Sequence, residues 1–194
     1  MIEIHLIDLT DPGSRIDLYT ACLKLRREVF ISSLGWNLHE TVGCEFDQYD
    51  FPASIHIAAT KGDQLVGCMR MLRTDSDHSG TTYMILDAHR GKIPNLPSGI
   101  MAEELVSDRI WEASRLAIST VVPTTARNEV LHALIDAGRD YVIERGGVAM
   151  LGMMNPVFRR IFRRVGHRVD LFGPVSDQRD GKICVLRWDF EGAA

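Results

Sequence analysis

The segment 110–118 reads as a strand inside a sheet, although two charged residues interrupt it. Its apolar and small residues form a short run that is typical of a sheet interior, and Glu112 and Arg115 stand among them. Ionised side chains in such a place are costly unless they are paired or hydrogen-bonded. The segment therefore predicts either a structural ion pair or charged groups that take part in chemistry.

The spacing of these two residues adds a condition on the backbone. Residues three apart in a regular strand point to opposite faces of the sheet. If Glu112 and Arg115 serve one cleft, an irregularity such as a β-bulge is expected between them.

Composition indicates one globular domain spanning residues 1–194, since 45% of the residues are hydrophobic and 25% are charged. The net charge of −4 gives no reason to expect nucleic-acid binding. No apolar run approaches the roughly 18 residues of a membrane span, and the N-terminus lacks the pattern of a signal peptide. We therefore expect a cytoplasmic protein.

Cysteine and histidine positions argue against a disulfide framework or a metal centre. The four cysteines are widely separated without a CxxC pair, and the seven histidines show no metal-binding spacing. We expect reduced thiols, no metal and no cofactor.

Hydrophobic periodicity predicts strands and helices in a mixed order. The predicted strands are 2–9, 55–60, 64–72, 110–118, 148–153, 168–172 and 182–189, and the predicted helices are 14–33, 124–145 and 155–165. Segments 37–53, 74–82 and 90–100 read as irregular. The order predicts an α/β fold, a mixed twisted sheet with helices packed on it, and it resembles the layout of the GNAT-type N-acyltransferases.

An arginine and two aromatic residues mark the end of the first predicted helix. Arg26 and Phe30 are four residues apart, on one helix face, and Trp36 follows the helix end. A guanidinium can take a carboxylate, and aromatic rings can take a flat or cationic group. An exposed arginine beside two core aromatics is the alternative.

Three carboxylates follow within six residues, Glu45, Asp47 and Asp50. A solvated acidic loop would explain them, but Arg70 stands among apolar residues in a predicted strand and needs acceptors. The carboxylates at 45–50 and Glu112 are the natural candidates.

These motifs together resemble the acyl-homoserine lactone synthases, which make quorum-sensing autoinducers. The series that carries the resemblance is Leu-Arg-x-x-Val-Phe at 25–30, Gly35-Trp36, Glu45-x-Asp47-x-x-Asp50, Gly67-x-x-Arg70 and Trp111-Glu112-x-Ser114-Arg115, with Arg163-Arg164-Val165-Gly166 further on. The resemblance implies S-adenosylmethionine as acceptor. It also implies an acyl group on acyl carrier protein, or on coenzyme A, as donor.

The resemblance also assigns roles to single residues. It implies Glu112 as the base, with Asp47, Asp50 and Arg70 setting the electrostatics. The residues implied to bind S-adenosylmethionine are Arg26, Phe30, Trp36 and Arg115. One position departs from the family, because Tyr83-Met84 leads to His89 where members usually carry a phenylalanine, which leaves the shape of the acceptor pocket open.

The acyl pocket is expected at the strand that contains Met153 and Met154. Family members that make 3-oxo products tend to have a threonine there. The methionines offer an apolar wall without a hydroxyl donor, so we expect an unsubstituted or branched acyl group. Plain core packing is the alternative for these methionines.

The helix 155–165 predicts a docking surface for the anionic donor. Helical spacing sets Phe158, Ile161, Phe162 and Val165 toward the core. The predicted docking residues are Arg159, Arg160, Arg163 and Arg164. A solvated helix face is the alternative.

The turn 122–127 contains no glycine, unlike the pyrophosphate-binding turn of acetyl-CoA-dependent GNAT enzymes. A standard acetyltransferase is therefore disfavoured. Two further functions stay open, a related N-acyl amino acid synthase with another amine acceptor and a non-catalytic GNAT-like binding domain.

Overall fold

The computed structural model of the chain describes residues 1–178 and 181–190. These residues form two compact units, the first made of Met1–Met71 and Arg115–Gly138 and the second of Leu72–Ser114 together with the described residues from Arg139 onward. Two strands, β5 (Gln64–Arg73) and β6 (Ile110–Ile118), each contain a boundary between the units. The expectation of a single domain stays a prediction.

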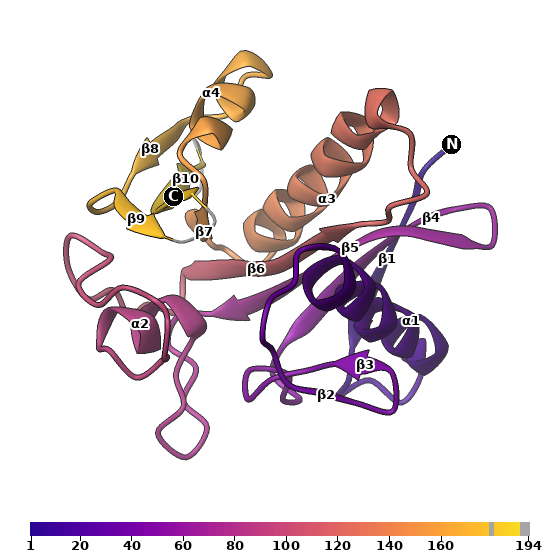
Figure 1. Cartoon of the computed structure of the whole chain (residues 1–194), viewed down its shortest axis with the longest axis horizontal. Coiled ribbons are helices and arrows are strands. Elements are labelled where there is room, and N and C mark those ends of the chain that lie inside the picture. Colours follow the sequence, from indigo (N-terminus) through magenta and orange to yellow (C-terminus); the bar gives the residue numbers. More distant parts are fainter. Residues whose placement is uncertain (179–180, 191–194) are drawn as a thin grey trace. The chain divides into compact units, whose positions relative to one another are not determined.

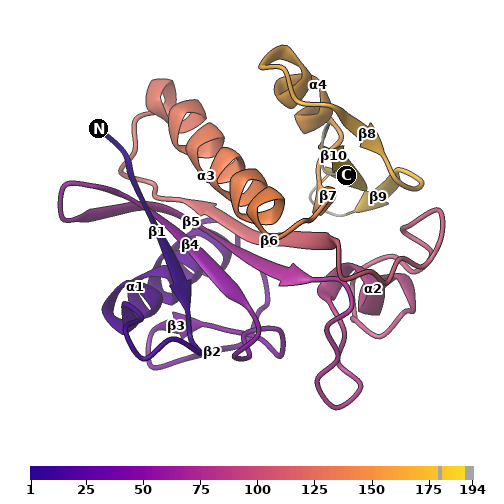
Figure 2. The same cartoon turned by 180° about the vertical axis from the view of Figure 1, so that it is seen from behind.

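The first unit is built on antiparallel strands in the order β1 (Glu3–Asp8), β4 (Ile55–Lys61) and β5, as Figures 1 and 2 show. Helix α1 (Ile16–Arg26) covers one face of these strands. Its apolar side chains, Leu18 and Cys22 among them, pack with Ala58 and Cys68 in one buried cluster. The predicted first helix and central hairpin are confirmed.

The chain then passes through a π-helix, η1 (Arg27–Ser33), before a turn at Gly35 with a φ of 68°. π-Helical turns are rare and occur frequently at functional sites. Residues after the turn, predicted to be irregular, contain a small hairpin of β2 (Glu40–Thr41) and β3 (Cys44–Glu45). Val42 and Gly43 both have positive φ, as a two-residue type I′ turn requires.

The second unit contains a mixed sheet, as the sequence predicts. Residues 110–113 of β6 pair in parallel with β7 (Ala149–Met154). The chain between them forms α3 (Thr124–Glu144), which belongs to the first unit up to Gly138 and to the second from Arg139. Strand β10 (Gly181–Asp189) runs antiparallel to β7 and also to β8 (Val169–Leu171) and β9 (Ser176–Gln178). A parallel pair joined through a helix is the usual βαβ arrangement.

Two helices of this unit differ from the sequence-based expectation. Helix α2 (Met84–His89) lies between the two predicted loops, and its first five residues are buried. Helix α4 (Val157–Arg164) ends one residue early. Phe162 is fully buried, but Val165, which we expected on the core side, is 50% exposed because it lies beyond the helix end.

No helix in the described part of the chain is long and apolar enough to cross a membrane.

Candidate functional site

A cluster of three guanidiniums and three carboxylates lies in the first unit. Arg26 donates to Glu45 from Nε (2.5 Å) and to Asp50 from Nη1 and Nη2 (2.7 and 2.8 Å). Arg70 bridges Asp47 (2.5 Å) and Asp50 (2.9 Å) from Nη1. Arg115 then closes the cluster through two contacts of its own, with Glu45 from Nε (3.1 Å) and with Asp47 from Nη2 (2.7 Å).

The predicted pairing of Arg70 with the carboxylates at 45–50 is confirmed. Burial opposes ionisation of Asp47 and Asp50, but the guanidinium of Arg70 attracts their charges, and the pKa of each carboxyl lies below its usual value. Equal numbers of positive and negative groups let the cluster stay charged in a buried place.

The cluster meets solvent at one end. The side chains of Arg26, Arg70, Glu45 and Asp50 are at most 1% exposed, whereas those of Asp47 and Arg115 are 11% and 12% exposed. A ligand that approaches from solvent therefore meets Asp47 and Arg115 before the other members.

Arg26, which was expected to bind S-adenosylmethionine, is almost fully buried. Three of its nitrogens already donate to protein carboxylates. These contacts favour a positioning role, in which Arg26 holds Glu45 and Asp50, over direct binding of a ligand's carboxylate. The sequence suggested Glu45 only as an acceptor for Arg70, whereas the structure gives it hydrogen bonds from Arg26 and Arg115.

Two aromatic rings lie beside the exposed end of the cluster. Phe30 and Trp36 stack with centroids 5.2 Å apart and planes 8° apart, and the guanidinium carbon of Arg115 lies 5.9 Å from the centre of the Phe30 ring. Phe30 is buried, but Trp36 is 38% exposed. Trp36 therefore offers an aromatic surface to solvent.

The expected irregularity in β6 is present at Arg115. Its φ is 52°, a left-handed value that costs free energy for a residue with a side chain. Pairing of β6 with β7 runs from Ile110 to Ala113 and ends before Arg115. Strand β6 nevertheless runs as one strand from Ile110 to Ile118, and a shared cleft for Glu112 and Arg115 stays a prediction.

His56 is a member of this region that sequence reasoning missed. It is 1% exposed, lies 3.9 Å from Asp50, and its Nε2 lies 3.1 Å from the hydroxyl of Ser54. Because Ser54 donates its own proton to the carbonyl of Phe51, Ser54 accepts from His56. Burial lowers the pKa of His56 to about 3 although Asp50 opposes the change, so the ring is neutral.

Glu112 lies in the second unit and is fully buried. Its carboxylate accepts the backbone N–H of Ile85 at 2.7 Å and that of Met84 at 3.3 Å, at the first turn of α2. A helix N-terminus favours a negative charge. Helix α2, which the sequence did not reveal, therefore orients this carboxylate.

Other predicted positions of this unit lie on α2 and β7. His89 ends α2, and its Nδ1 accepts the N–H of Met101 at 3.1 Å, so a neutral ring carries its proton on Nε2. Met153 and Met154 lie at the end of β7, half-buried.

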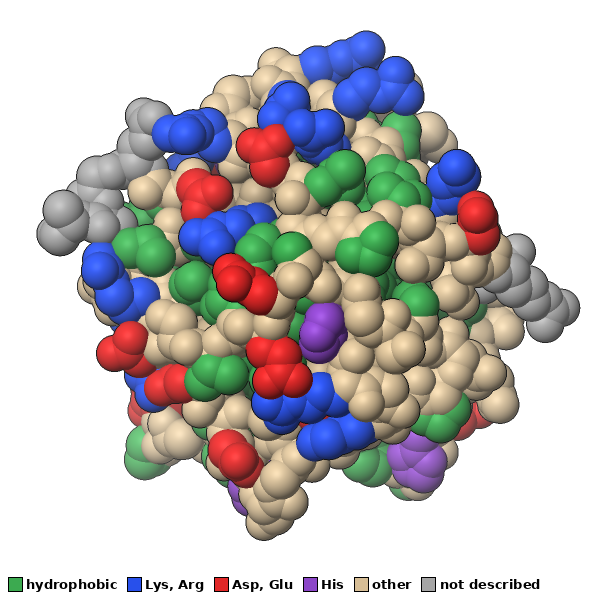
Figure 3. Space-filling model, turned by 90° about the vertical axis from the view of Figure 1, so that its left-hand side faces the viewer, with side chains coloured by type: hydrophobic (Ala, Val, Ile, Leu, Met, Phe, Trp, Pro, Cys, Tyr) green, Lys and Arg blue, Asp and Glu red, His purple; other side chains and the backbone are tan. Residues whose placement is uncertain are grey.

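The arginines of α4 fall into two pairs. Arg159 and Arg163 each donate to Asp170 of β8 at 2.6 Å, an acidic partner that the sequence did not suggest. Arg160 and Arg164 lie on the adjacent flank and are exposed. Figure 3 shows one face of the molecule, on which basic side chains (blue) and acidic side chains (red) both reach the surface.

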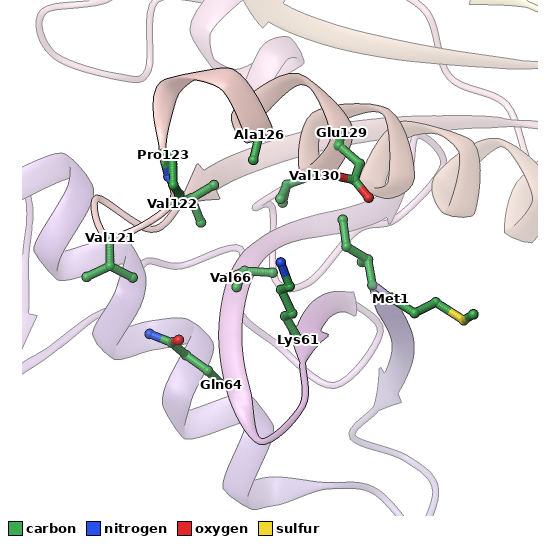
Figure 4. A pocket seen from close by; sticks show the side chains of 11 residues that line it. Met1, Lys61, Gln64, Val66, Val121, Val122, Pro123, Ala126, Glu129 and Val130 are labelled. Atoms are coloured by element: carbon green, nitrogen blue, oxygen red, sulfur yellow. The ribbon is translucent and has the colours of Figure 1, made fainter.

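A cavity of about 240 Å³ also lies in the first unit (Figure 4). Its lining includes Lys61, Val66, Val122 and Val130, and none of the predicted site residues lines it. Among the described residues, no group of three or more His, Cys, Asp or Glu side chains could hold a metal ion.

Comparison with known proteins places these residues in a family. The family model "Autoinducer synthase" matches residues 14–193. An acyl-homoserine-lactone synthase of Ralstonia nicotianae is 30% identical over 159 residues, which cover 77% of this chain and 71% of that protein.

Solved structures share the fold. A coenzyme-A-dependent acyl-homoserine lactone synthase, BjaI, solved with SAM and isopentyl-CoA, matches with a TM-score of 0.74 at 21% identity, over 99% of this chain and 85% of that one. A putative N-acetyltransferase from Lactobacillus plantarum matches with a TM-score of 0.60 at 12% identity, over 97% and 99%. The GNAT-like α/β fold is thus confirmed, and the chain belongs to the autoinducer synthase family.

Proposed function

We propose that this chain is an acyl-homoserine lactone synthase that transfers an acyl group from a thioester to the amine of S-adenosylmethionine. The observation that carries the proposal is the buried, charge-balanced cluster with its exposed end at Asp47 and Arg115, in a chain of the autoinducer synthase family. The BjaI structure, solved with SAM and isopentyl-CoA, supports the choice of both substrates.

The exposed end of the cluster suits the charges of this acceptor. S-adenosylmethionine carries an ammonium, a sulfonium and a carboxylate. Arg115 takes the carboxylate, Asp47 attracts the cationic groups, and Trp36 offers its ring to the sulfonium or to the flat adenine. The buried ring of Phe30 stacks against the ring of Trp36 and holds it in place.

The buried members hold this arrangement in place. Arg70 and Arg26 fix Asp47, Asp50 and Glu45 through short, charge-assisted hydrogen bonds. Groups that are fixed before the substrate binds need no reorganisation during the reaction.

Glu112 is the proposed base. The acceptor's amine loses a proton to Glu112, directly or through a water, and attacks the thioester carbonyl carbon. The carbon–sulfur bond then breaks, and the donor leaves as a thiol. The acceptor's carboxylate displaces methylthioadenosine, whose sulfur keeps the electron pair of the broken bond, and the lactone ring closes.

The turn before α3 favours a carrier-protein donor over coenzyme A. The N–H groups of Val122 and Ala126 donate to Ser119 and Pro123 within the turn, and Pro123 has no N–H. Arg127 donates to the carbonyls of Val122 and Thr120. The turn contains no glycine, unlike a typical pyrophosphate-binding turn, and the arginines of α4 offer a surface to an acidic carrier protein.

Release of methylthioadenosine tests the proposal. The purified chain is incubated with S-adenosylmethionine and either octanoyl carrier protein or octanoyl-CoA, and the products are identified by mass spectrometry. We expect N-octanoyl homoserine lactone and equimolar methylthioadenosine. An N-acyl amino acid without methylthioadenosine indicates the related synthase, and binding without turnover indicates a non-catalytic domain.

The role of Glu112 is tested by Glu112→Gln, which keeps the shape of the side chain. General-base catalysis contributes roughly 10²–10⁴ in rate, so kcat should fall at least about 100-fold while the Kd for S-adenosylmethionine changes little. Glu104→Gln is the matched control, because Glu104 is exposed and pairs with Arg90 on the surface of the same unit. Near wild-type turnover of Glu112→Gln across pH would exclude this base.

A further inference from the structure

Trp188 lies on the same face of the sheet as Met154, one of the two residues expected to line the acyl pocket. It stands on β10 opposite Met150 of β7, and Leu186 and Cys184 stand opposite Gly152 and Met154. Alternate residues of a strand share a face. Trp188 and Met154 therefore lie on one face of the β7–β10 pair, and this face becomes half-buried at Met154. We call this face the wall.

Gly152 gives the indole ring its place on this wall. A Cβ at Gly152 would lie 3.1 and 3.3 Å from two carbons of the Trp188 ring, and 2.9 Å from the methyl group of Met154. The ring thus rests on the backbone of β7. Phe162 of α4 packs edge-on against the ring, with the ring centres 5.1 Å apart, and this contact also holds the ring in place.

The indole N–H in this wall is unsatisfied. Trp188 is 1% exposed, and its Nε1 has no hydrogen-bond partner among the residues that the structure describes. A buried tryptophan N–H usually finds an acceptor, because leaving it unpaired costs free energy. The orphaned donor lies on the strand pair where the acyl pocket is expected, and it is explained if the acyl chain brings the acceptor.

We propose that Trp188 is a specificity-determining residue whose indole N–H binds an oxygen on the acyl chain of the donor. The proposal rests on the proposed function and names the acyl class, a chain that carries a hydrogen-bond acceptor. The expectation of an unsubstituted or branched chain rested on the lack of a hydroxyl on β7, and Trp188 supplies a donor from β10 instead.

The test compares three acyl groups of equal length on acyl carrier protein. They are octanoyl, 3-oxooctanoyl with its oxygen near the thioester, and 8-hydroxyoctanoyl with its oxygen at the far end. We expect wild-type kcat/KM to be about tenfold higher for one oxygenated donor than for octanoyl, which corresponds to about 1.4 kcal/mol. Trp188→Phe should abolish this preference by lowering kcat/KM for that oxygenated donor about tenfold more than for octanoyl.

Trp111→Phe is the matched control. Trp111 is also buried in the second unit and packs edge-on against Tyr141, so it reports the loss of an indole from the core. It should change all three donors by the same factor. Equal loss on all donors in Trp188→Phe, or no wild-type preference for either oxygenated donor, would overturn the proposal. Absence of lactone with every donor would instead contradict the proposed function.

A binding measurement gives a second readout if Trp188→Phe folds poorly. The chain has three tryptophans, so the ¹⁵N-labelled protein gives three indole signals that Trp36→Phe and Trp111→Phe assign. Adding the preferred oxygenated homoserine lactone should move the Trp188 indole proton downfield, and octanoyl homoserine lactone should not. The same shift with both products would contradict a hydrogen bond to the chain's oxygen.

Discussion

Single residues in the cluster differ in how their charges respond to pH. His56 is neutral because burial lowers its pKa to about 3 from 6.5. Asp47 and Asp50 stay ionised well below the usual range of a carboxyl group, since arginines surround them. A neutral histidine beside a balanced set of charges keeps the region free of excess positive charge.

His56 should make stability depend on pH above the range in which the carboxylates titrate. Between about pH 3 and pH 6.5 the unfolded chain binds a proton at His56 that the folded chain does not bind, so stability rises with pH across this window. The contribution is about 1.4 kcal/mol per pH unit. Urea unfolding of His56→Gln between about pH 4.5 and 6.5 should show a slope smaller by this amount.

His39→Gln is the control for this measurement, because His39 is exposed and lies outside the cluster. It should keep the wild-type slope. An unchanged slope in His56→Gln would mean that His56 is not buried in its neutral form.

At the scale of elements, two arginines of α4 bind β8 and two are exposed to solvent. Arg159 and Arg163 donate to the carbonyl of Val169 as well as to Asp170. These bonds tie α4 to β8. Arg160 and Arg164, one helical turn apart, are exposed on the other flank.

Arg160 and Arg164 should contribute more to donor docking than Arg159 and Arg163, which are bound to Asp170. Arg160→Glu with Arg164→Glu should raise the KM for acyl carrier protein about tenfold at low salt and leave that for S-adenosylmethionine unchanged, because charge complementarity acts on association. The control is Arg15→Glu with Lys24→Glu, which makes the same charge change on the exposed surface of α1 and just before it. An unaltered donor KM in the α4 variant would show that Arg160 and Arg164 are ordinary solvent-exposed residues that do not bind the donor.

At the scale of the whole molecule, the buried cluster links segments that are far apart in the chain. Arg26, Glu45 and Arg115 come from α1, β3 and β6, and the contact between Arg115 and Glu45 spans 70 residues. Breaking such a cluster on one side leaves buried charge uncompensated. Its integrity should therefore matter for the free energy of unfolding as well as for activity.

Neighbouring arginines allow a direct test. Arg26→Ala should lower the free energy of unfolding by roughly 3–5 kcal/mol, because Glu45 and Asp50 lose their partner in a buried place. Arg27→Ala is the matched control, since its ion pair with Glu40 is about 40% exposed and such pairs contribute roughly 0–1 kcal/mol. Equal losses in chemical denaturation would show that the cluster does not stabilise the fold.

Periodicity in the sequence predicted most helices and strands, because local burial patterns repeat with the geometry of each element. It failed at α2 and at the hairpin of β2 and β3. Helix α2 has five consecutive buried residues and so no amphipathic pattern. The hairpin has only two residues in each strand, too few to alternate.

The sequence by itself determined the order of elements, the family motifs and the presence of charged residues in buried strands. Only the tertiary structure decided which charges meet: that Arg26 turns inward to Glu45 and Asp50, that Asp170 takes two arginines of α4, and that the first turn of α2 orients Glu112. The physical reason is distance through space. A local pattern reports which face of an element is buried, whereas ion pairs and hydrogen bonds depend on which distant segments the fold brings within about 3 Å.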